Sequence, residues 1–396
     1  MLDSIVRKHL GDTFPACAAC AYHHGEVVLH GAWGWIDPET KQIPVTRDTL
    51  FDLASVTKTF AATAFLAQVS AGRAGLDDPV IGVVPEFGGD SPRPIDGGQD
   101  PHSKERQPPD PTFAGQSVDV SRVTFRHLLT HTSGLPPWRD VYNAAGPAPL
   151  PPEQADPIAP AVRWKRAMEA IYGYPFVGQP DGRTVRYSDI GLMLLGEAAV
   201  RLSGADAMEA LIGQTLGDFA PKPVYNPVRD HGIARERIAP TEDDPTWRKR
   251  RVWGEVHDEN TCGAGGASSH AGLFATAETV AAFGQRWLEG ASAFGITPQI
   301  WREATRQQVD DHDTRRGLGW ALRGKVDSMA GELMSMNAFG HSGFTGTSLW
   351  IDPERALVVA LLTNRVYPGR WHEGIDGGIH GFRRAAHDTI VEGVKS

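Results

Sequence analysis

The sequence predicts a mixed α/β fold in which both chain ends build one antiparallel sheet and helices flank it. Residues 17–36 read as a hairpin of two strands, and four further strand-like runs occur after residue 317. The chain between these runs shows helical spacing and long loops. These observations predict a sheet domain from residues 1–75 and 310–396, and a mainly helical domain from residues 76–309.

The N-terminal part begins with a short amphipathic helix over residues 1–12, followed by the hairpin. Cys17 and Cys20 form a C-x-x-C, but an offset of three places the two thiols on opposite faces of a strand, so we expect them to pack. The odd total of three cysteines does not indicate a disulfide framework. Apolar residues recur at helical spacing from Phe60 to Val69 and stop at Gly72, which predicts a buried helix that starts near Ser55.

The middle of the chain alternates loops and helices. Residues 88–118 are rich in Gly, Pro and Asp, and we expect them to be an exposed insertion; residues from about 136 to 160 form a second, Pro-rich loop. A second clear helix follows Tyr187, with either Ser188 or Asp189 as its cap, and ends at Gly204. Residues 205–276 show little periodicity. Further helices are predicted at 123–130, 277–289, 298–308 and 378–392, and strands at 318–322, 338–341, 347–351 and 356–363.

The charge balance limits the partners. A formal net charge of −9 argues against nucleic acid or an anionic membrane, because both require a basic face, and favours a small-molecule ester, amide or peptide substrate. No stretch approaches the ~20 apolar residues that span a bilayer. The charged first ten residues lack the apolar run of a secretory signal, which gives the expectation of a cytoplasmic protein.

Ser55 and Lys58 are the first candidate catalytic pair. Three residues make nearly one helical turn, so both side chains would share a face. A serine hydroxyl is a weak nucleophile, and the Lys58 amine could take its proton or stabilise its alkoxide. A buried helix that carries a nucleophile at its N-terminus also directs free N–H groups and the positive end of its dipole toward the reacting atoms.

Three short motifs occur in order: S-V-T-K at 55–58, Y-S-D at 187–189 and H-S-G at 341–343. Together they resemble the serine β-lactamase and penicillin-binding-protein superfamily, in its class C β-lactamase-like branch. Residues 128–135, 187–196, 256–260 and 270–274 also look like that branch. The resemblance extends from about residue 15 to 392 and implies a β-lactamase/transpeptidase-like fold.

The resemblance implies a role for each motif. Ser55 would attack a carbonyl and form an acyl-enzyme, and Lys58 and Tyr187 would share the proton transfers, in a division that the residues leave open. The backbone N–H groups of Ser55 and Phe344 would form the oxyanion hole. Gly343, after His341 and Ser342, would leave room for the substrate. Neither a cofactor nor a metal is implied.

Two positions depart from the lactamase pattern. His341 stands where lactamases have a lysine, and a mostly neutral imidazole is a weaker anchor for a substrate carboxylate. Asp189 stands where an asparagine is common, and an ionised carboxylate donates no hydrogen bond. We therefore predict a serine hydrolase of the esterase or small-peptide type. The alternatives are a D,D-carboxypeptidase, a D-aminopeptidase or a weak β-lactamase, and, in another class, a non-catalytic binding or scaffold protein.

Two other groups of residues could have a functional or a structural role. His257, Asp258, Cys262 and His270 match no usual zinc spacing, so we expect hydrogen bonds within a loop. Three aromatic side chains could either line the substrate cleft or pack at the surface: Trp138, Tyr142 and Trp253.

Overall fold

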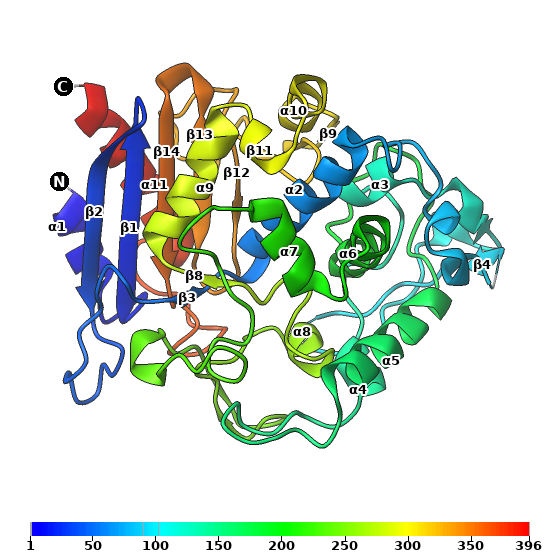
Figure 1. Ribbon diagram of the computed structural model, residues 1–396, viewed down its shortest axis with the longest axis horizontal. Coiled ribbons are helices and arrows are strands. Elements are labelled where there is room, and N and C mark those ends of the chain that lie inside the picture. Colours follow the sequence, from blue (N-terminus) through cyan, green and yellow to red (C-terminus); the bar gives the residue numbers. More distant parts are fainter. Residues whose placement is uncertain (1, 90, 102, 396) are drawn as a thin grey trace.

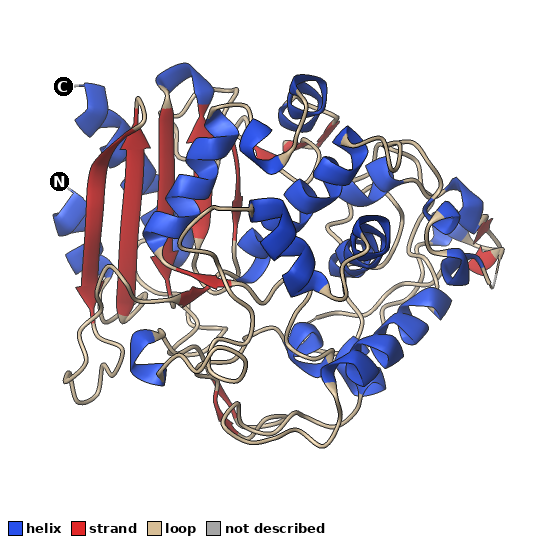
Figure 2. Ribbon diagram, viewed as in Figure 1, coloured by secondary structure: helices blue, strands red, loops and turns tan. Residues whose placement is uncertain are grey.

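The computed structural model describes residues 2–89, 91–101 and 103–395, and an eight-stranded antiparallel sheet built by both chain ends forms one side of it (Figures 1 and 2). The strand order is β2-β1-β14-β13-β12-β11-β10-β9. The N-terminal hairpin therefore pairs directly with the last strand, with Cys17 opposite Thr363 and His23 opposite Leu357. The strands are β1 Ala16–His23, β2 Glu26–Gly34, β9 Val309–Asp311, β10 Thr314–Arg316, β11 Ala321–Leu322, β12 Phe339–Ser342, β13 Ser348–Asp352 and β14 Leu357–Thr363.

Helices cover both faces of this sheet. Alternate residues of β1 and β14 point to opposite sides, as the strand period of two requires. Cys17 packs with residues of α1 (Leu2–His9) and α11 (Gly378–Lys395), whereas Cys20 joins the larger core, which includes α9 (Ala277–Leu288). The two thiols thus lie on opposite faces, and burial raises the pKa of Cys20 to about 12.

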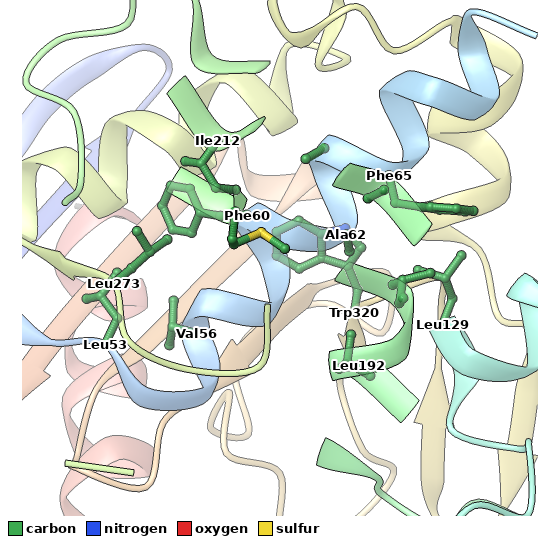
Figure 3. Packing of buried hydrophobic residues seen from close by; sticks show 14 of the residues in the cluster. Leu53, Val56, Phe60, Ala62, Phe65, Leu129, Leu192, Ile212, Leu273 and Trp320 are labelled. Carbon is green, nitrogen blue, oxygen red and sulfur yellow. The ribbon is translucent and has the colours of Figure 1, made fainter. Parts of the chain in front are cut away.

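Helix α2 (Thr57–Ser70) lies near the centre of the molecule (Figure 1), and Figure 3 shows the apolar side chains packed around it. All of its residues from Thr57 to Leu66 are buried. Phe60 stacks on Phe283 of α9 with ring centroids 3.8 Å apart, and Ala62, Leu129 and Trp320 meet nearby. The remaining helices are α3 Phe125–Thr130, α4 Val141–Ala145, α5 Pro160–Gly173, α6 Asp189–Ser203, α7 Met208–Leu216, α8 Glu259–Gly263 and α10 Pro298–Thr305.

Several elements differ from those predicted. Helices α5 and α7 and strands β9 and β10 were not expected, and the strand at 318–322 is reduced to the two residues of β11. Such short strands exist because a neighbouring strand supplies their hydrogen bonds, which no local pattern encodes. Three two-stranded sheets complete the structure: β3 Phe51–Asp52 with β8 Phe274–Ala275, β4 Arg93–Pro94 with β5 Ser117–Val118, and β6 Asp243–Asp244 with β7 Arg250–Arg251.

The segment 88–118 is anchored at its base and exposed further out. Strands β4 and β5 close the base, where the buried Arg93 donates to the carbonyl of Tyr174 and its guanidinium lies 4.3 Å from the Phe87 ring centroid. Residues 105–112 are exposed. Pro101, which lies between the base of the segment and these exposed residues, lines the cavity that contains the candidate active site.

Candidate active site

Ser55 lies in the short 3₁₀ turn Ala54–Val56 that leads into α2. The preceding residue, Ala54, has a φ of +44°, a left-handed conformation that costs a non-glycine residue free energy and is typical of functional sites. Asp52 holds this turn from β3: its carboxylate accepts from the N–H of Ala54 at 2.8 Å and from the N–H of His257 at 2.6 Å. The strained turn is therefore fixed by a fully buried carboxylate.

Lys58 connects the nucleophile to two other segments. Its Nζ donates to Ser55 Oγ at 2.8 Å and to the carbonyl of His270 at 3.0 Å, and it lies 2.8 Å from Oδ1 of Asp189. The side chain is 1% exposed. Burial lowers the pKa of Lys58, but the interactions of its amine with the Asp189 carboxylate and with Tyr187 outweigh burial, so the pKa is raised. Lys58 is therefore an ammonium that donates to the serine hydroxyl.

Tyr187 lies beside this ammonium, just before α6. Lys58 Nζ is 4.9 Å from its ring centroid, and the guanidinium of Arg316 is 5.3 Å from the same ring. The buried ring of His131 packs against it at 4.5 Å. His131 also accepts, through Nδ1, from the N–H of Ser188 at 3.0 Å, which fixes the backbone that follows Tyr187.

Ser188 is the cap of α6, which answers the choice between Ser188 and Asp189. The hydroxyl of Ser188 accepts from the N–H of Gly191 at 2.9 Å, as an N-cap side chain does. Asp189 is instead the first residue of the helix, and its carboxylate is directed to Lys58. An asparagine here would leave the Lys58 ammonium without its counter-charge.

The segment 341–344 lies on the other side of Ser55. His341 belongs to β12, is buried, and its Nδ1 lies 2.9 Å from the carbonyl of Ser342. Burial, with the charges of Lys58 and Arg316, lowers the pKa of His341 to about 3, so its imidazole is neutral. Phe344 follows at the edge of the cleft with 37% of its surface exposed.

Gly343 also allows a close contact within the protein, in addition to the room for the substrate that the sequence predicts. A Cβ atom at this position would lie 2.2 Å from Thr347 Oγ1 and 2.5 Å from the carbonyl oxygen of Leu53. The glycine therefore allows the segment after β12 to contact the Leu53–Ala54 backbone that precedes the serine. A side chain at position 343 would therefore collide with Thr347 and with the Leu53 backbone even when no substrate is bound.

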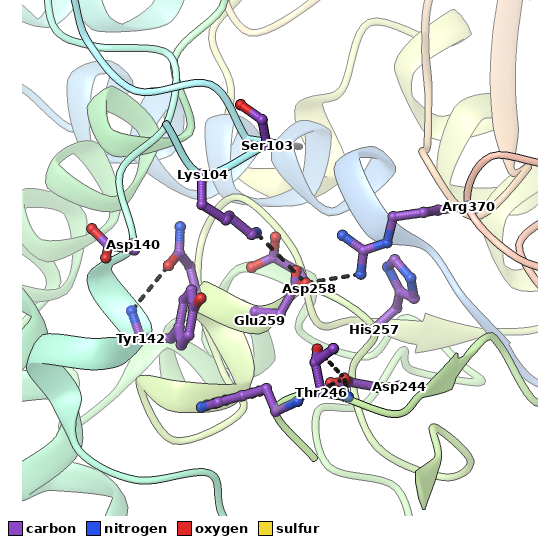
Figure 4. Close-up of polar contacts among 12 residues, drawn as sticks. Ser103, Lys104, Asp140, Tyr142, Asp244, Thr246, His257, Asp258, Glu259 and Arg370 are labelled. Carbon is purple, nitrogen blue, oxygen red and sulfur yellow. Dashed lines mark hydrogen bonds and ion pairs between the residues drawn. The ribbon is translucent and has the colours of Figure 1, made fainter. Parts of the chain in front are cut away.

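A second polar cluster, which the sequence did not predict, borders the cavity with its residues His257, Glu259 and Arg370 (Figure 4). His257 Nε2 lies 3.0 Å from Glu242 Oε1, and Arg370 pairs with both Glu242 and Glu259. Lys104 of the 88–118 segment lies 3.8 Å from Glu259 on the other side. Burial raises the pKa of Glu242, but His257 and Arg370 outweigh it, so the pKa is lowered well below the usual range. Of these residues, only His257 and Glu259 lie in a segment that resembles the family, residues 256–260. No pattern in the sequence around Glu242 predicts that it belongs to the cluster.

The loop histidine at 270 is held by hydrogen bonds, as expected. Its Nε2 lies 2.9 Å from Asp258 Oδ1, and its Nδ1 lies 2.9 Å from Ser268 Oγ. These contacts fix the 270 carbonyl that accepts from Lys58. Within the described residues no group of three or more His, Cys, Asp or Glu side chains is arranged to hold a metal ion.

A cavity of about 680 Å³ joins these segments. Ser55, Tyr187, His341 and Phe344 line it together with Arg316 of β10, which the sequence had not marked. Of the three aromatic candidates, Trp138 lines the cavity. Tyr142 packs on Trp247 at 4.8 Å, and Trp253 donates from its indole to the carbonyls of Arg235 and Ile238.

Comparisons with known proteins give a family and several relatives for this chain. Residues 2–377 match the protein family described as Beta-lactamase. The chain is 26% identical to an Escherichia coli protein named "Putative D-alanyl-D-alanine carboxypeptidase", over 92% of this chain and 81% of that protein. It is 29% identical to a Bacillus subtilis protein named N-acetylmuramyl-L-alanine amidase, over 92% of this chain and 80% of that one.

Solved structures share the fold. EstCE1, described as a hydrolase with promiscuous acyltransferase activity, superposes with a TM-score of 0.69 at 19% identity, covering 98% of this chain and 97% of its own. A penicillin-binding protein homologue from Caulobacter crescentus gives a TM-score of 0.65 at 21% identity, covering 98% and 96%. These likenesses confirm the predicted mixed α/β fold. Among the helices of the described residues, none combines the length and apolar character of a membrane span.

Proposed function

The chain belongs to the β-lactamase family and is a hydrolase of the serine β-lactamase and penicillin-binding type, and on that premise we propose that Ser55 is its nucleophile. The observation that carries the proposal is the 2.8 Å hydrogen bond from the Lys58 ammonium to Ser55 Oγ in the wall of the cavity. An ammonium in this position stabilises the alkoxide as the hydroxyl attacks a carbonyl. The acyl group then passes to Ser55, and water releases it.

The division of the proton transfers follows from the charge on Lys58. A protonated amine cannot accept the serine proton, so we assign that step to the phenolate oxygen of Tyr187, which becomes a phenol on accepting it; the Tyr187 ring lies near the cations of Lys58 and Arg316. The same phenol returns the proton to the leaving group. Lys58 then serves as the fixed positive charge, and Asp189 keeps it protonated.

The bond we propose is the amide or ester of a small substrate. The names of the two relatives at 26% and 29% identity are those of enzymes that cleave amide bonds, which favours a small peptide. The neutral His341 lacks the charge of a lactamase lysine, which favours peptidase or esterase action over β-lactam turnover. A non-catalytic scaffold would not require the buried Lys58 ion pair at a serine.

The test is intact-mass spectrometry after incubation with a fluorophosphonate and, separately, with a labelled penicillin. We expect the wild type to gain one fluorophosphonate adduct and Ser55→Ala to gain none. A penicilloyl adduct that is released slowly would assign the chain to the penicillin-binding type. Absence of any adduct on the folded wild type with both reagents would refute the serine hydrolase mechanism.

A further inference from the structure

Arg383, on the C-terminal helix α11, is buried against the turn between β12 and β13. It is 3% exposed, and one guanidinium nitrogen, Nη2, donates to the carbonyl of Gly343 at 2.7 Å and to that of Thr347 at 2.8 Å. The Gly343 carbonyl also accepts from the N–H of Gly346 at 3.1 Å, and the Thr347 carbonyl accepts from the N–H of Gly343 at 2.7 Å. Arg383 therefore binds both of the carbonyls that hold this turn closed.

The peptide unit that Arg383 holds lies at the cavity that contains Ser55. The carbonyl of Gly343 and the N–H of Phe344 belong to one planar peptide unit, so a donor to that carbonyl also fixes the direction of this N–H. Ser55, Gly343 and Phe344 all line the cavity. The next carbonyl, that of Phe344, accepts from Arg365 at 2.7 Å. Each of the two peptide units that flank the Phe344 Cα is thus held by a guanidinium.

The positive charge of Arg383 is more than the turn alone requires. Among the described residues no carboxylate forms an ion pair with it, and its Nε is buried without a hydrogen-bond partner. Burial, together with the charge of Arg365, lowers the pKa of Arg383 to about 9, so it remains a cation at neutral pH. A buried cation without a counter-charge is costly, whereas a neutral amide could donate to the same carbonyls. Such a charge is useful where negative charge develops during the reaction.

We propose that Arg383 is a positioning residue for the oxyanion, which directs the Phe344 N–H toward the reacting carbonyl oxygen and polarises it. The inference rests on the proposed function. When Ser55 Oγ bonds to the carbonyl carbon of the substrate, an electron pair of the C=O bond moves to the oxygen, and it returns when the leaving atom departs. A guanidinium that donates to the carbonyl of a peptide unit draws electron density from it, which makes the N–H of the same unit a stronger donor. The effect is therefore largest in the transition state, where the oxygen is negative.

The experiment compares p-nitrophenyl acetate with p-nitrophenyl thionoacetate, which differ only in the oxygen or sulfur atom that takes the negative charge. Sulfur is a weak hydrogen-bond acceptor, so donors that stabilise an oxyanion stabilise it little. Relative to hydrolysis of each ester by hydroxide, we expect wild-type kcat/KM to be ~100-fold or more higher for the oxygen ester. Arg383→Met lowers this ratio ~10-fold or more by slowing the oxygen ester, and Arg383→Lys retains part of it. Arg384→Gln, on the same helix but paired with Asp327 and Glu332 at the surface, retains the full ratio.

Two results would overturn the assignment. One is a wild type that accelerates both esters equally, because no donor then acts on the oxyanion; this result is decisive even where Arg383→Met fails to fold. The other is a folded Arg383→Met enzyme that slows both esters by the same factor or slows neither, because Arg383 would then act only on the stability of the turn. Fluorophosphonate labelling of the wild type separates the two proposals: labelled Ser55 together with either result refutes the Arg383 assignment alone, and an unlabelled, inactive wild type refutes the serine hydrolase mechanism.

Discussion

At the residue scale, Lys58 directs its ammonium to a hydroxyl, a carboxylate and a carbonyl that come from three parts of the chain. The carboxylate of Asp189 is the partner that keeps the amine charged in a buried position. A buried amine without a counter-charge loses its proton more easily, because burial disfavours the charged form. Asp189 therefore keeps Lys58 positively charged beside Ser55.

Asp189→Asn should move the alkaline limb of the kcat/KM profile to lower pH. The substitution removes the charge that raises the pKa of Lys58 and leaves the burial that lowers it, so the amine loses its proton at a lower pH than in the wild type. The measurement is kcat/KM for a p-nitrophenyl ester between pH 6 and 10. A variant that becomes faster as Lys58 loses its proton would instead identify Lys58 as the base.

Tyr187→Phe should lower the turnover of a p-nitrophenyl ester ~10²-fold or more, because the ring remains and only the proton-transferring oxygen is lost. Tyr22→Phe, in strand β1 away from the cavity, is the matched control and should behave as wild type. Steady-state rates at a saturating ester concentration provide the comparison. An unchanged rate in Tyr187→Phe would remove this residue from the mechanism.

At the scale of elements, the turn between β12 and β13 holds the nucleophile's backbone in place. Thr345 Oγ1 donates to the carbonyl of Asp52, and Thr347 Oγ1 donates to that of Leu53, both at 2.8 Å. Gly343 permits this approach because it has no Cβ. The strained Ala54 is therefore clamped between Asp52 on one side and this turn on the other.

Gly343→Ala should loosen that clamp. The added methyl would lie 2.2 Å from Thr347 Oγ1 and 2.5 Å from the Leu53 carbonyl, so we expect a loss of about 1–3 kcal/mol in the free energy of unfolding and a marked fall in kcat/KM. Gly213→Ala, in the open surface of α7 with nothing within 4 Å of its Cβ, should stabilise the protein slightly. Urea unfolding and ester kinetics test both; full activity in Gly343→Ala would contradict this account of the clamp.

The elements differ in how far local sequence determines them. Helices α2, α6, α9 and α11 and the hairpin of β1 and β2 followed from apolar spacing and turn residues. Strands β9 to β11 did not, because two or three residues carry no pattern and their partners lie across the sheet. Helix α7 was missed although four of its residues are buried.

The residues of the site also fall into two groups: those that sequence motifs identify and those that only the structure identifies. The order of the three motifs was enough to single out Ser55, Lys58 and Tyr187, which the structure brings together around the cavity. Arg316 and Glu242 had no such marker, because their importance comes from neighbours that are distant in the chain. The pairing of Asp189 with Lys58 could not be read from an N-cap motif that fits Ser188 equally well.

At the scale of the whole molecule, buried neutral histidines set the response to acid. Burial lowers the pKa of His387 in α11 to about 3, and its Nδ1 lies 2.9 Å from the carbonyl of Met329. The unfolded chain binds a proton at this residue below about pH 6.5, while the folded chain stays neutral until about pH 3. The stabilising effect of the neutral form is therefore complete above pH 6.5 and is lost as the pH falls toward 3.

Between these two pKa values, each such histidine should lower the free energy of unfolding by about 1.4 kcal/mol for every unit by which the pH falls. His387→Gln, which does not titrate, should therefore show a shallower loss of stability between pH 6.5 and 4.5 than the wild type. His312→Gln is the control, because that side chain is 99% exposed. Urea unfolding at four pH values tests the difference, and parallel curves for His387→Gln and wild type would contradict it.

The pairing of the first strand with the last has a consequence for synthesis on the ribosome. Ser55 and Lys58 emerge early, but the segment that lines the other side of the cleft, the turn that clamps Ala54 and the strand that pairs with β1 all belong to the final part of the chain. Contacts over such sequence distances form late. We therefore expect the growing polypeptide to carry its nucleophile without acyl-transfer activity, so that the hydrolase becomes active only when its C-terminal part has been made.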